Sequence, residues 1–497
     1  MAFRLTRLLS TLLSRSFSSG AFKPSSAVWN ARALEAFPVL TAQSPQDDRM
    51  PSFMVGETNG FLPRQAPLVE LPNRFHKLEY LLQRMPLVMA NGEEGLLAKG
   101  KFGDAVKALP EYEVDDITDA QLLSALYRDY TFVASAYLLE PCDIMYREKK
   151  DYGLGRQVLP RNVAVPLAKV AAKIGAKPFM EYALSYSLYN YKRIDPTKGL
   201  TYDNLALIRA FAGSESEKGF ILNHVTMVAF SGDLIKHTQS ILSSCGRKDR
   251  QEFTQALCDL NTTYSRINEE MECMWQRSQP ADYQKFRTFI MGTKNQPMFP
   301  HGVIYEGVSD TPMFLRGESG ANDSMVPLGD NVLQLTARMP ENPLTKVLRD
   351  FRTYRPTNHR EYLEYVQYKA DELGVRDFAM SDSESAAWYL ANVDQIRAFR
   401  HRHWNFTKEY IIKYSLHPVA TGGSPIVSWL PNQLGTVLNT LVETSQQIDR
   451  SALNPELKAL VAEIDERVQA QQRVLTREVA KLKEQYGSSQ ELNESQM

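Results

Sequence analysis

Apolar residues recur every three or four positions through most of the chain between Pro160 and Glu443, and this spacing strongly limits the possible folds. It places them along one side of α-helices and does not fit the alternation of β-strands. We expect a mostly α protein with a large all-helical domain at residues 156–445. A smaller, mainly helical domain is expected at residues 74–155. The predicted helices, besides one beginning near Arg74, are Asp119–Glu140, Pro166–Ile174, Met180–Lys192, Lys218–Ser243, Arg250–Ser278, Asp282–Met291, Leu344–Tyr354, Arg360–Leu373, Ser385–Ser415 and Pro431–Glu443.

Two segments inside and before these domains lack helical spacing. Residues 35–73 are rich in Pro, Ser and Gly and are predicted to be an extended linker. The stretch Gly292–Pro340 is also rich in Gly, Pro, Ser and Asp, and such a long irregular connection is usually functional or disordered. Within it, Val303–Tyr305 and Met313–Leu315 are predicted to form short extended pieces.

The tail at residues 446–497 is charged and carries one row of apolar residues at helical spacing. Gln471 and Glu478 interrupt one of the two rows that a coiled coil requires. The pattern therefore favours a solvated helix with one weakly apolar edge.

The first 34 residues contain five basic residues and no acid, and their leucines interleave with arginines before a run of serines. This composition is typical of a mitochondrial transit peptide. A disordered tail on a cytoplasmic protein is the alternative.

Charge and cysteine content exclude several classes of protein. The formal net charge is −1, so no basic excess is available for a nucleic-acid partner. The four cysteines are scattered without a C-x-x-C pair, which argues against a disulfide framework and a cysteine-based zinc site. No uninterrupted apolar run is long enough for a membrane span. We expect a monomer.

One of the eight histidines lies in an unusual position. His403 occupies the step between Phe399 and Phe406 on the apolar side of the predicted helix Ser385–Ser415. A buried imidazole needs partners for its ring nitrogens, and a haem iron is one such partner. Arg400 lies one turn earlier and could pair with a haem propionate. On spacing alone, a structural core histidine is the alternative.

Eight segments, in order along residues 74–443, resemble the indoleamine 2,3-dioxygenase family. Together they make coincidence improbable, although no single one is specific enough. They are Val158–Pro166 (VLPRNVAVP), Asp195–Tyr202 (DPTKGLTY), Lys218–Phe220 (KGF), Val303–Gly307 (VIYEG), Gly317–Gly320 (GESG), Leu348–Tyr354 (LRDFRTY) with His359 and Arg360, the pair Arg400 and His403, and Thr421–Ser424 (TGGS).

The resemblance implies a role for individual residues around a haem b cofactor. His403 corresponds to the iron ligand and Arg400 to a residue beside a haem propionate. Further residues implied at the haem are Ser319, Gly320 and Asp330. Those implied at the substrate are Tyr182, Phe220, Tyr283, Arg287, Ser319 and Thr421. Of these, Arg287 corresponds to the arginine that pairs with the substrate carboxylate, through a planar fork that suits two hydrogen bonds.

Two positions depart from the family pattern. His224 stands where many members carry a small hydroxyl residue, one helical turn after Phe220. A histidine there is expected to take part in catalysis, or to stabilise bound O2 without turnover, or to be structural. Asp282 replaces one of two adjacent aromatics, so its carboxylate either points away from the substrate or changes the substrate preference.

The resemblance implies a dioxygenase that opens the indole ring of L-tryptophan or a related indoleamine, giving N-formylkynurenine in the first step of tryptophan catabolism. Such an enzyme consumes O2 and needs an electron donor that keeps the iron ferrous. Two alternatives belong to other classes. One is a non-catalytic haem protein that binds or senses O2, and the other is a helical interaction scaffold without haem.

Overall fold

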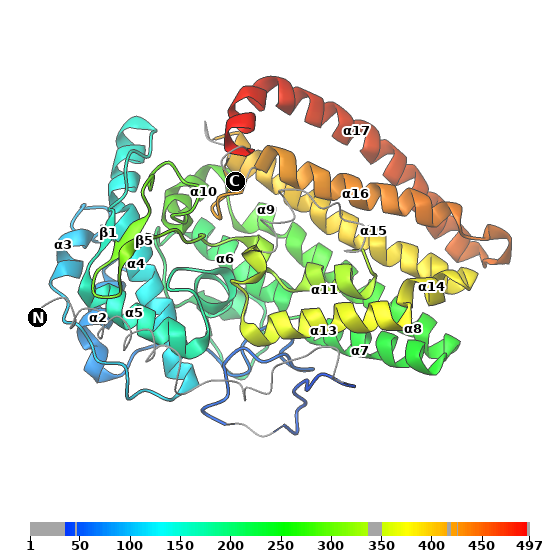
Figure 1. The fold of residues 1–497 in the computed structure, drawn as a ribbon, viewed down its shortest axis with the longest axis horizontal. Coiled ribbons are helices and arrows are strands. Elements are labelled where there is room, and N and C mark those ends of the chain that lie inside the picture. The colour runs from blue at the N-terminus through cyan, green and yellow to red at the C-terminus, as the bar shows by residue number, and fades with distance from the viewer. Residues whose placement is uncertain (1–34, 45–46, 336–349, 415–418, 425, 495–497) are drawn as a thin grey trace, which may run out of the picture.

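The computed structural model describes residues 35–44, 47–335, 350–414, 419–424 and 426–494 (Figure 1). The predicted transit peptide at residues 1–34 lies outside these ranges, as does much of the predicted helix Leu344–Tyr354. Most of the described elements are helices, which confirms the mostly α prediction. No helix within the described ranges combines the length and apolar character needed to cross a bilayer.

The N-terminal part of the fold combines short helices with a small sheet. It contains α2 (His76–Gln83), α3 (Phe102–Lys107) and the long α4 (Ala120–Lys149), which Asp119 caps by accepting a hydrogen bond from the Leu122 amide. Strands β1 (Val158–Leu159), β4 (Val303–Tyr305) and β5 (Ser309–Met313) pair in the order β1-β4-β5. The β1–β4 pair is parallel and the β4–β5 pair is antiparallel. The irregular stretch therefore does contain extended structure, at and near the predicted positions.

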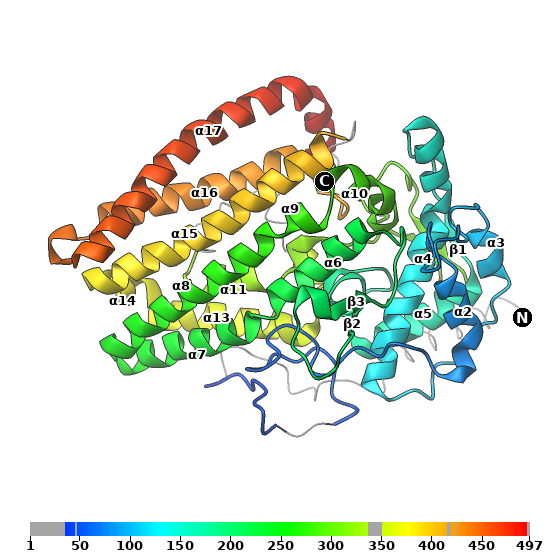
Figure 2. The ribbon, with the colours of Figure 1, turned by 180° about the vertical axis from the view of Figure 1, so that it is seen from behind.

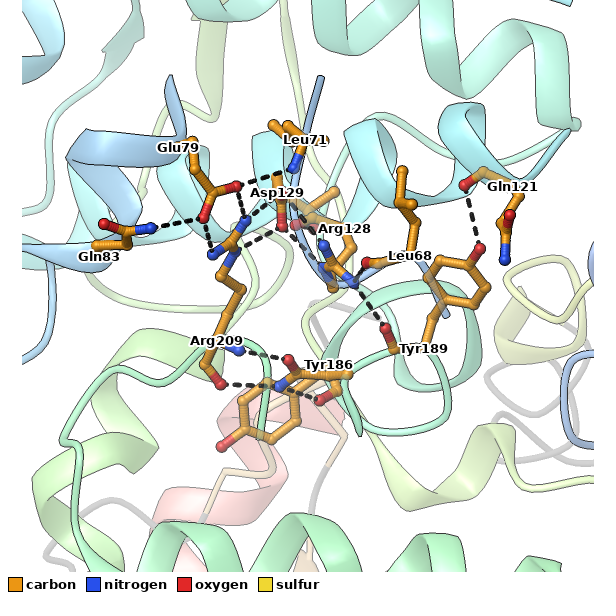
Figure 3. Close-up of polar contacts among 12 residues, drawn as sticks. Leu68, Leu71, Glu79, Gln83, Gln121, Arg128, Asp129, Tyr186, Tyr189 and Arg209 are labelled. Atoms are coloured by element: carbon orange, nitrogen blue, oxygen red, sulfur yellow. Dashed lines mark hydrogen bonds and ion pairs between the residues drawn. The ribbon is translucent and has the colours of Figure 1, made fainter. Parts of the chain in front are cut away.

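A buried network of charges joins α4 to the segment that precedes α6 (Figure 3). The Arg209 guanidinium donates to Asp129 of α4, with 2.8 Å between Nη2 and Oδ2, and to Glu79 of α2, with 2.6 Å between Nη2 and Oε2. Arg128 also pairs with Asp129, at 2.7 Å between Nε and Oδ1. Because all four groups are buried or nearly so, the loss of one partner would leave an uncompensated charge in the interior.

The larger part is a stack of long helices (Figures 1 and 2). Neighbouring helices in the stack pack in the order α7, α8, α15, α16 and α17, with α6, α11, α13 and α14 beside them. Their bounds, together with those of α5, α9 and α10, are α5 (Arg161–Ile174), α6 (Glu215–Val228), α7 (Ser231–Arg247), α8 (Arg250–Glu272), α9 (Met274–Arg277), α10 (Pro280–Arg287), α11 (Met325–Val332), α13 (Thr357–Leu373), α14 (Val375–Met380), α15 (Ser383–Phe406), α16 (Ile426–Gln446) and α17 (Pro455–Glu494).

The predicted helix Met180–Lys192 is wrong. The chain makes a π-helical turn at Tyr182–Tyr186 and then enters strand β2 (Tyr191–Arg193), which pairs with β3 (Leu205–Leu207). Asn190 holds this path, because its amide nitrogen donates to the Tyr186 and Arg209 carbonyls. Local side-chain bonds of this kind compete with a regular helix.

The predicted helix Lys218–Ser243 is two helices, α6 and α7, separated at Ala229 and Phe230. The N-terminal segment packs at this break, where the Phe61 amide donates to the Ser231 hydroxyl over 2.9 Å. Gly232 faces the same segment, and a Cβ there would lie 2.5 Å from the Glu57 carbonyl oxygen. The long-range contact therefore explains a break that the local sequence does not signal.

The charged tail forms α17, but it is not a solvated helix. Val461, Ile464 and Val468 are buried against the neighbouring helices. Both polar residues that interrupt the apolar row contact α15: Gln471 accepts from Arg397 Nη1 at 2.6 Å, and Glu478 accepts from Trp404 Nε1 at 2.8 Å. The tail thus packs on the helix that carries His403.

Candidate haem and substrate site

A cavity of about 260 Å³ lies between α6, α10, α11, α13, α15 and the loops around residues 318–321 and 420–424. It brings together all but two of the residues that the sequence placed at the site. Those on its wall are Phe220, His224, Tyr283, Ser319, Gly320, Asp330, Arg400, His403 and Thr421, whereas Tyr182 and Arg287 are not on it.

His403 projects into this cavity from the last turns of α15. Its imidazole has no hydrogen-bonding partner among the described residues, and burial lowers its pKa to about 4. The ring is therefore neutral near pH 7, which is the state in which it can bind a metal. A structural core histidine would instead have its ring nitrogens paired with protein groups.

Arg400 and Asp330 form an ion pair beside His403. The distance from Arg400 Nη2 to Asp330 Oδ2 is 2.7 Å, and both side chains are largely buried. The second terminal nitrogen of Arg400, Nη1, is buried, and no acceptor for it lies in the described ranges. The guanidinium therefore keeps one donor unused next to His403.

Three further arginines border the cavity: Arg352, Arg355 and Arg360. Arg355 donates to the Ala321 carbonyl over 2.9 Å, and burial together with Arg352 lowers its pKa to about 10. Arg352 and Arg360 belong to the residues that carry the family resemblance, and Arg355 directly follows one of these segments, yet sequence reasoning did not assign them to the site. The signal was present as several arginines close to His359, but only the fold shows that they border the cavity that Arg400 lines.

The other side of the cavity is formed by α6. Phe220 and His224 lie one turn apart with 5.3 Å between ring centroids. Burial, and secondarily the presence of His403, lower the pKa of His224 to about 4, so this ring is also neutral near pH 7. His224 and His403 line the same cavity, from α6 and α15 respectively.

Tyr182 lies behind His224 and not on the cavity wall. Its hydroxyl is 3.3 Å from His224 Nδ1, and burial raises the pKa of this phenol, so it stays protonated. Among the described residues, Nδ1 is the only hydrogen-bonding partner of this hydroxyl. With the phenol as the donor, the ring proton of His224 lies on Nε2.

Aromatic rings build the wall next to Phe220. Its centroid lies 5.2 Å from that of Tyr283 and 5.6 Å from that of Phe286, and Tyr283 also packs edge-on against Tyr410 at 5.6 Å. These contacts are typical of tilted and edge-to-face aromatic packing. The result is an apolar slot suited to a flat ring.

Asp282 points away from this slot. Its carboxylate accepts from the Ser216 hydroxyl at 2.9 Å and from Lys285 Nζ at 2.7 Å, and these bonds hold the pKa of Asp282 below its usual value. Of the two outcomes that the sequence left open, the structure therefore has the carboxylate outside the substrate region.

Arg287 is buried behind the aromatic wall. It donates to the Val419 carbonyl over 2.8 Å and to the Tyr152 hydroxyl over 3.3 Å, while its Nε has no acceptor. Within the described residues it forms no ion pair. Burial of a guanidinium without a counter-ion is unfavourable. Arg287 lies one helical turn after Tyr283, so it is close to the cavity although it does not line it.

Two loops close the remaining side. Thr421 is buried and its hydroxyl donates to the Glu318 carbonyl over 2.5 Å, which ties the glycine-rich loop to the loop of Ser319 and Gly320. Glu318 itself lines the cavity with only 3% of its surface exposed, and burial raises the pKa of its carboxyl to about 8. Sequence reasoning quoted this residue within a motif but gave it no role.

The residues present fit a haem. Among the described residues, no group of three or more His, Cys, Asp and Glu side chains is arranged to hold a metal ion. A lone histidine such as His403 is instead the usual protein ligand of an iron that the porphyrin already holds. The unused donor of Arg400 and the neighbouring arginines suit the two propionates of that group.

The chain matches the family model described as indoleamine 2,3-dioxygenase over residues 49–468. It is 27% identical to mouse indoleamine 2,3-dioxygenase 1 over 352 residues, which is 70% of this chain and 81% of the mouse protein. It is 24% identical to the Saccharomyces cerevisiae indoleamine 2,3-dioxygenase, over 72% of this chain and 79% of the yeast protein. A protein named myoglobin from Haliotis diversicolor is also 24% identical, over 74% of this chain and 90% of that protein. Matched along most of its length, and with the expected residues gathered around one cavity, the chain belongs to the indoleamine 2,3-dioxygenase family.

Proposed function

We propose that this protein is a haem-dependent dioxygenase that opens the indole ring of L-tryptophan. The reaction cleaves the C2–C3 bond of the indole and places one atom of O2 on each carbon, giving N-formylkynurenine without net consumption of a reductant. The observation that carries the proposal is the pair His403 and His224, which line one cavity with an aromatic slot beside them. A haem bound through His403 would supply the ferrous iron at which O2 is activated.

The residues of the chain would bind and orient the substrate. Phe220 and Tyr283 supply apolar surface for the indole, and the enclosed slot excludes water from it. The proton on His224 Nε2 points to a hydrogen bond within the cavity, because Nδ1 already accepts from Tyr182. That donor can hold an oxygen atom of the reacting pair or orient the substrate, and it stays uncharged near pH 7.

The amino-acid end of the substrate would lie towards the two loops. Ser319 and Thr421 are on the cavity wall there, and Arg287 lies behind Tyr283 with no ion-pair partner among the described residues. We propose that Arg287 pairs with the substrate carboxylate after exchanging its bond to the Val419 carbonyl. A charged partner would compensate for the burial of the guanidinium.

The test is product formation by the haem-loaded protein with a chemical reductant, L-tryptophan and heavy-isotope O2. Mass spectrometry should find N-formylkynurenine carrying both heavy oxygen atoms, and the His224→Ala variant should make less of it. If the ferrous protein holds O2 in a long-lived complex that L-tryptophan neither perturbs nor consumes, the protein is an oxygen binder and the proposal is wrong.

We also propose that the protein acts in mitochondria, on the basis of the basic, acid-free residues 1–34. A fluorescent fusion of the full chain should reach mitochondria, whereas a fusion that starts at residue 35 should stay in the cytoplasm. Identical distributions of the two fusions would contradict this location.

A further inference from the structure

Glu318 is a buried carboxyl group on the cavity wall that has no side-chain partner among the described residues. Only 3% of its surface is exposed, and within the described part of the chain no group donates a hydrogen bond to its side chain and no cation pairs with it. Other buried acids near the site differ in this respect. Glu181 accepts from the Ala183 amide, and Asp323 accepts from the amides of Met325 and Val326.

The surroundings of Glu318 make its ionised form unfavourable unless a cation binds beside it. Burial is the main cause of the raised pKa values of Tyr182, Tyr186 and Tyr283, and the charge of Glu318 raises them further. The same charge adds to the raised pKa of Glu181, which is also buried. Burial alone accounts for the raised pKa of Glu318. An ionised carboxylate is stable in such a place only when a positive group enters.

Glu318 and Arg287 are both tied to the loop of residues 419–424, because Arg287 donates to the Val419 carbonyl and Thr421 donates to the Glu318 carbonyl. Burial is the main cause of the raised pKa of Tyr283, and the charge of Glu318 adds to this effect while that of Arg287 opposes it. An α-amino acid carries the two complementary charges on one carbon. The indole would then rest against Phe220 and Tyr283 with its charged end towards the loop of Glu318.

We propose that Glu318 receives the ammonium group of the substrate and thereby selects indoles that carry an amine. This inference rests on the proposed function for the kind of ligand, and it adds the residue that recognises one group of that ligand. A charge-assisted hydrogen bond to a buried carboxylate is among the stronger polar contacts. Indoles with an amine should therefore bind better than indoles with a carboxylate alone.

The test measures dissociation constants by calorimetry on the haem-loaded ferric protein, which binds without turnover. The ligands are L-tryptophan, tryptamine, which keeps only the amine, and indole-3-propionate, which keeps only the carboxylate. Glu318→Gln should weaken L-tryptophan and tryptamine by about 10- to 100-fold and leave indole-3-propionate unchanged or tighter. Glu361→Gln, which removes a charge from a half-buried position on α13 away from the cavity wall, should change none of the three.

Each other outcome overturns the inference. These are equal losses for all three ligands, no loss for any of them, and failure of the wild-type protein to bind either amine. If Glu318→Gln does not fold, the wild-type protein alone decides, because L-tryptophan must bind at least about tenfold more tightly than indole-3-propionate. Amine-selective binding without formation of N-formylkynurenine would refute the proposed reaction and leave the role of Glu318 intact.

Discussion

Variants of the ion pair between Arg400 and Asp330 can separate its effect on the free energy of unfolding from its effect on haem binding. With 2.7 Å between Arg400 Nη2 and Asp330 Oδ2 and an effective dielectric constant of about 20, the attraction is about 6 kcal/mol before desolvation is subtracted. Breaking a buried pair by removing one partner costs about 3–5 kcal/mol, because the other charge is left uncompensated. Both residues line a cavity that admits water in the haem-free protein, so we expect the lower end of that range.

Asp330→Leu and Arg400→Met should each lower the free energy of unfolding of the haem-free protein by about 3 kcal/mol. The double variant should lie within about 1 kcal/mol of the wild type, because apolar residues of similar volume can replace a buried ion pair. The assay is urea denaturation followed by circular dichroism. The exposed pair Glu409 and Lys413 is the control, and Glu409→Gln should show no measurable change.

The double variant should regain stability without regaining haem affinity. It lacks the Arg400 Nη1 donor, which has no acceptor in the described part of the chain and is available for a propionate. Single variants that lose less than about 1 kcal/mol, or a double variant that loses the sum of both, would refute the reasoning about the buried charges.

Three further predictions concern neighbouring groups. Tyr182→Phe should lower kcat about tenfold, since it removes the hydroxyl that orients His224. Tyr186→Phe should have no effect, because that hydroxyl has no hydrogen-bond partner among the described residues, and equal losses of kcat in steady-state kinetics would contradict the assignment. Burial and Arg355 lower the pKa of His359 to about 3, so the unfolded chain binds a proton at this residue before the folded chain does as pH falls below about 6.5. The free energy of unfolding should therefore drop towards pH 3. In denaturation curves between pH 6 and 4, His359→Gln should reduce the slope of the free energy of unfolding against pH by about 1.4 kcal/mol per pH unit. Ile464→Ala should cost about 2–4 kcal/mol in urea denaturation, because this side chain of α17 is buried against the neighbouring helices. The exposed Lys458→Ala should cost nothing measurable, and equal effects would mean that the tail does not pack as described.

Helical spacing predicted long helices such as α8 and α13 well, because each of these two buries one side and leaves another in contact with solvent. It failed at Met180–Lys192, where nearly every residue through Tyr191 is buried and no solvent-facing side remains to define a period. The short helix α11 was missed for a different reason. It spans only eight residues and contains Pro327 and Gly329, which local rules assign to a loop.

In the candidate site, too, some residues could be predicted from the sequence and others could not. His403 could be singled out because its position on a long helix is periodic, and motifs in family order added the residues around it. Glu318 and Arg355 could not be found in this way, because burial without a partner is a property of the folded chain. The sequence also could not decide the direction of Asp282, which depends on Ser216 from another helix.

The central claim is that His403 is the residue through which this protein binds haem, and haem retention tests it most directly. Wild-type protein, His403→Ala and His401→Ala would each be titrated with haem, and the bound fraction read from the absorption band after gel filtration. His401 is the matched control, because it lies on the same helix two residues away and does not line the cavity. We predict that wild-type protein and His401→Ala bind one haem per chain and that His403→Ala retains none. Unchanged haem content in His403→Ala would contradict the account.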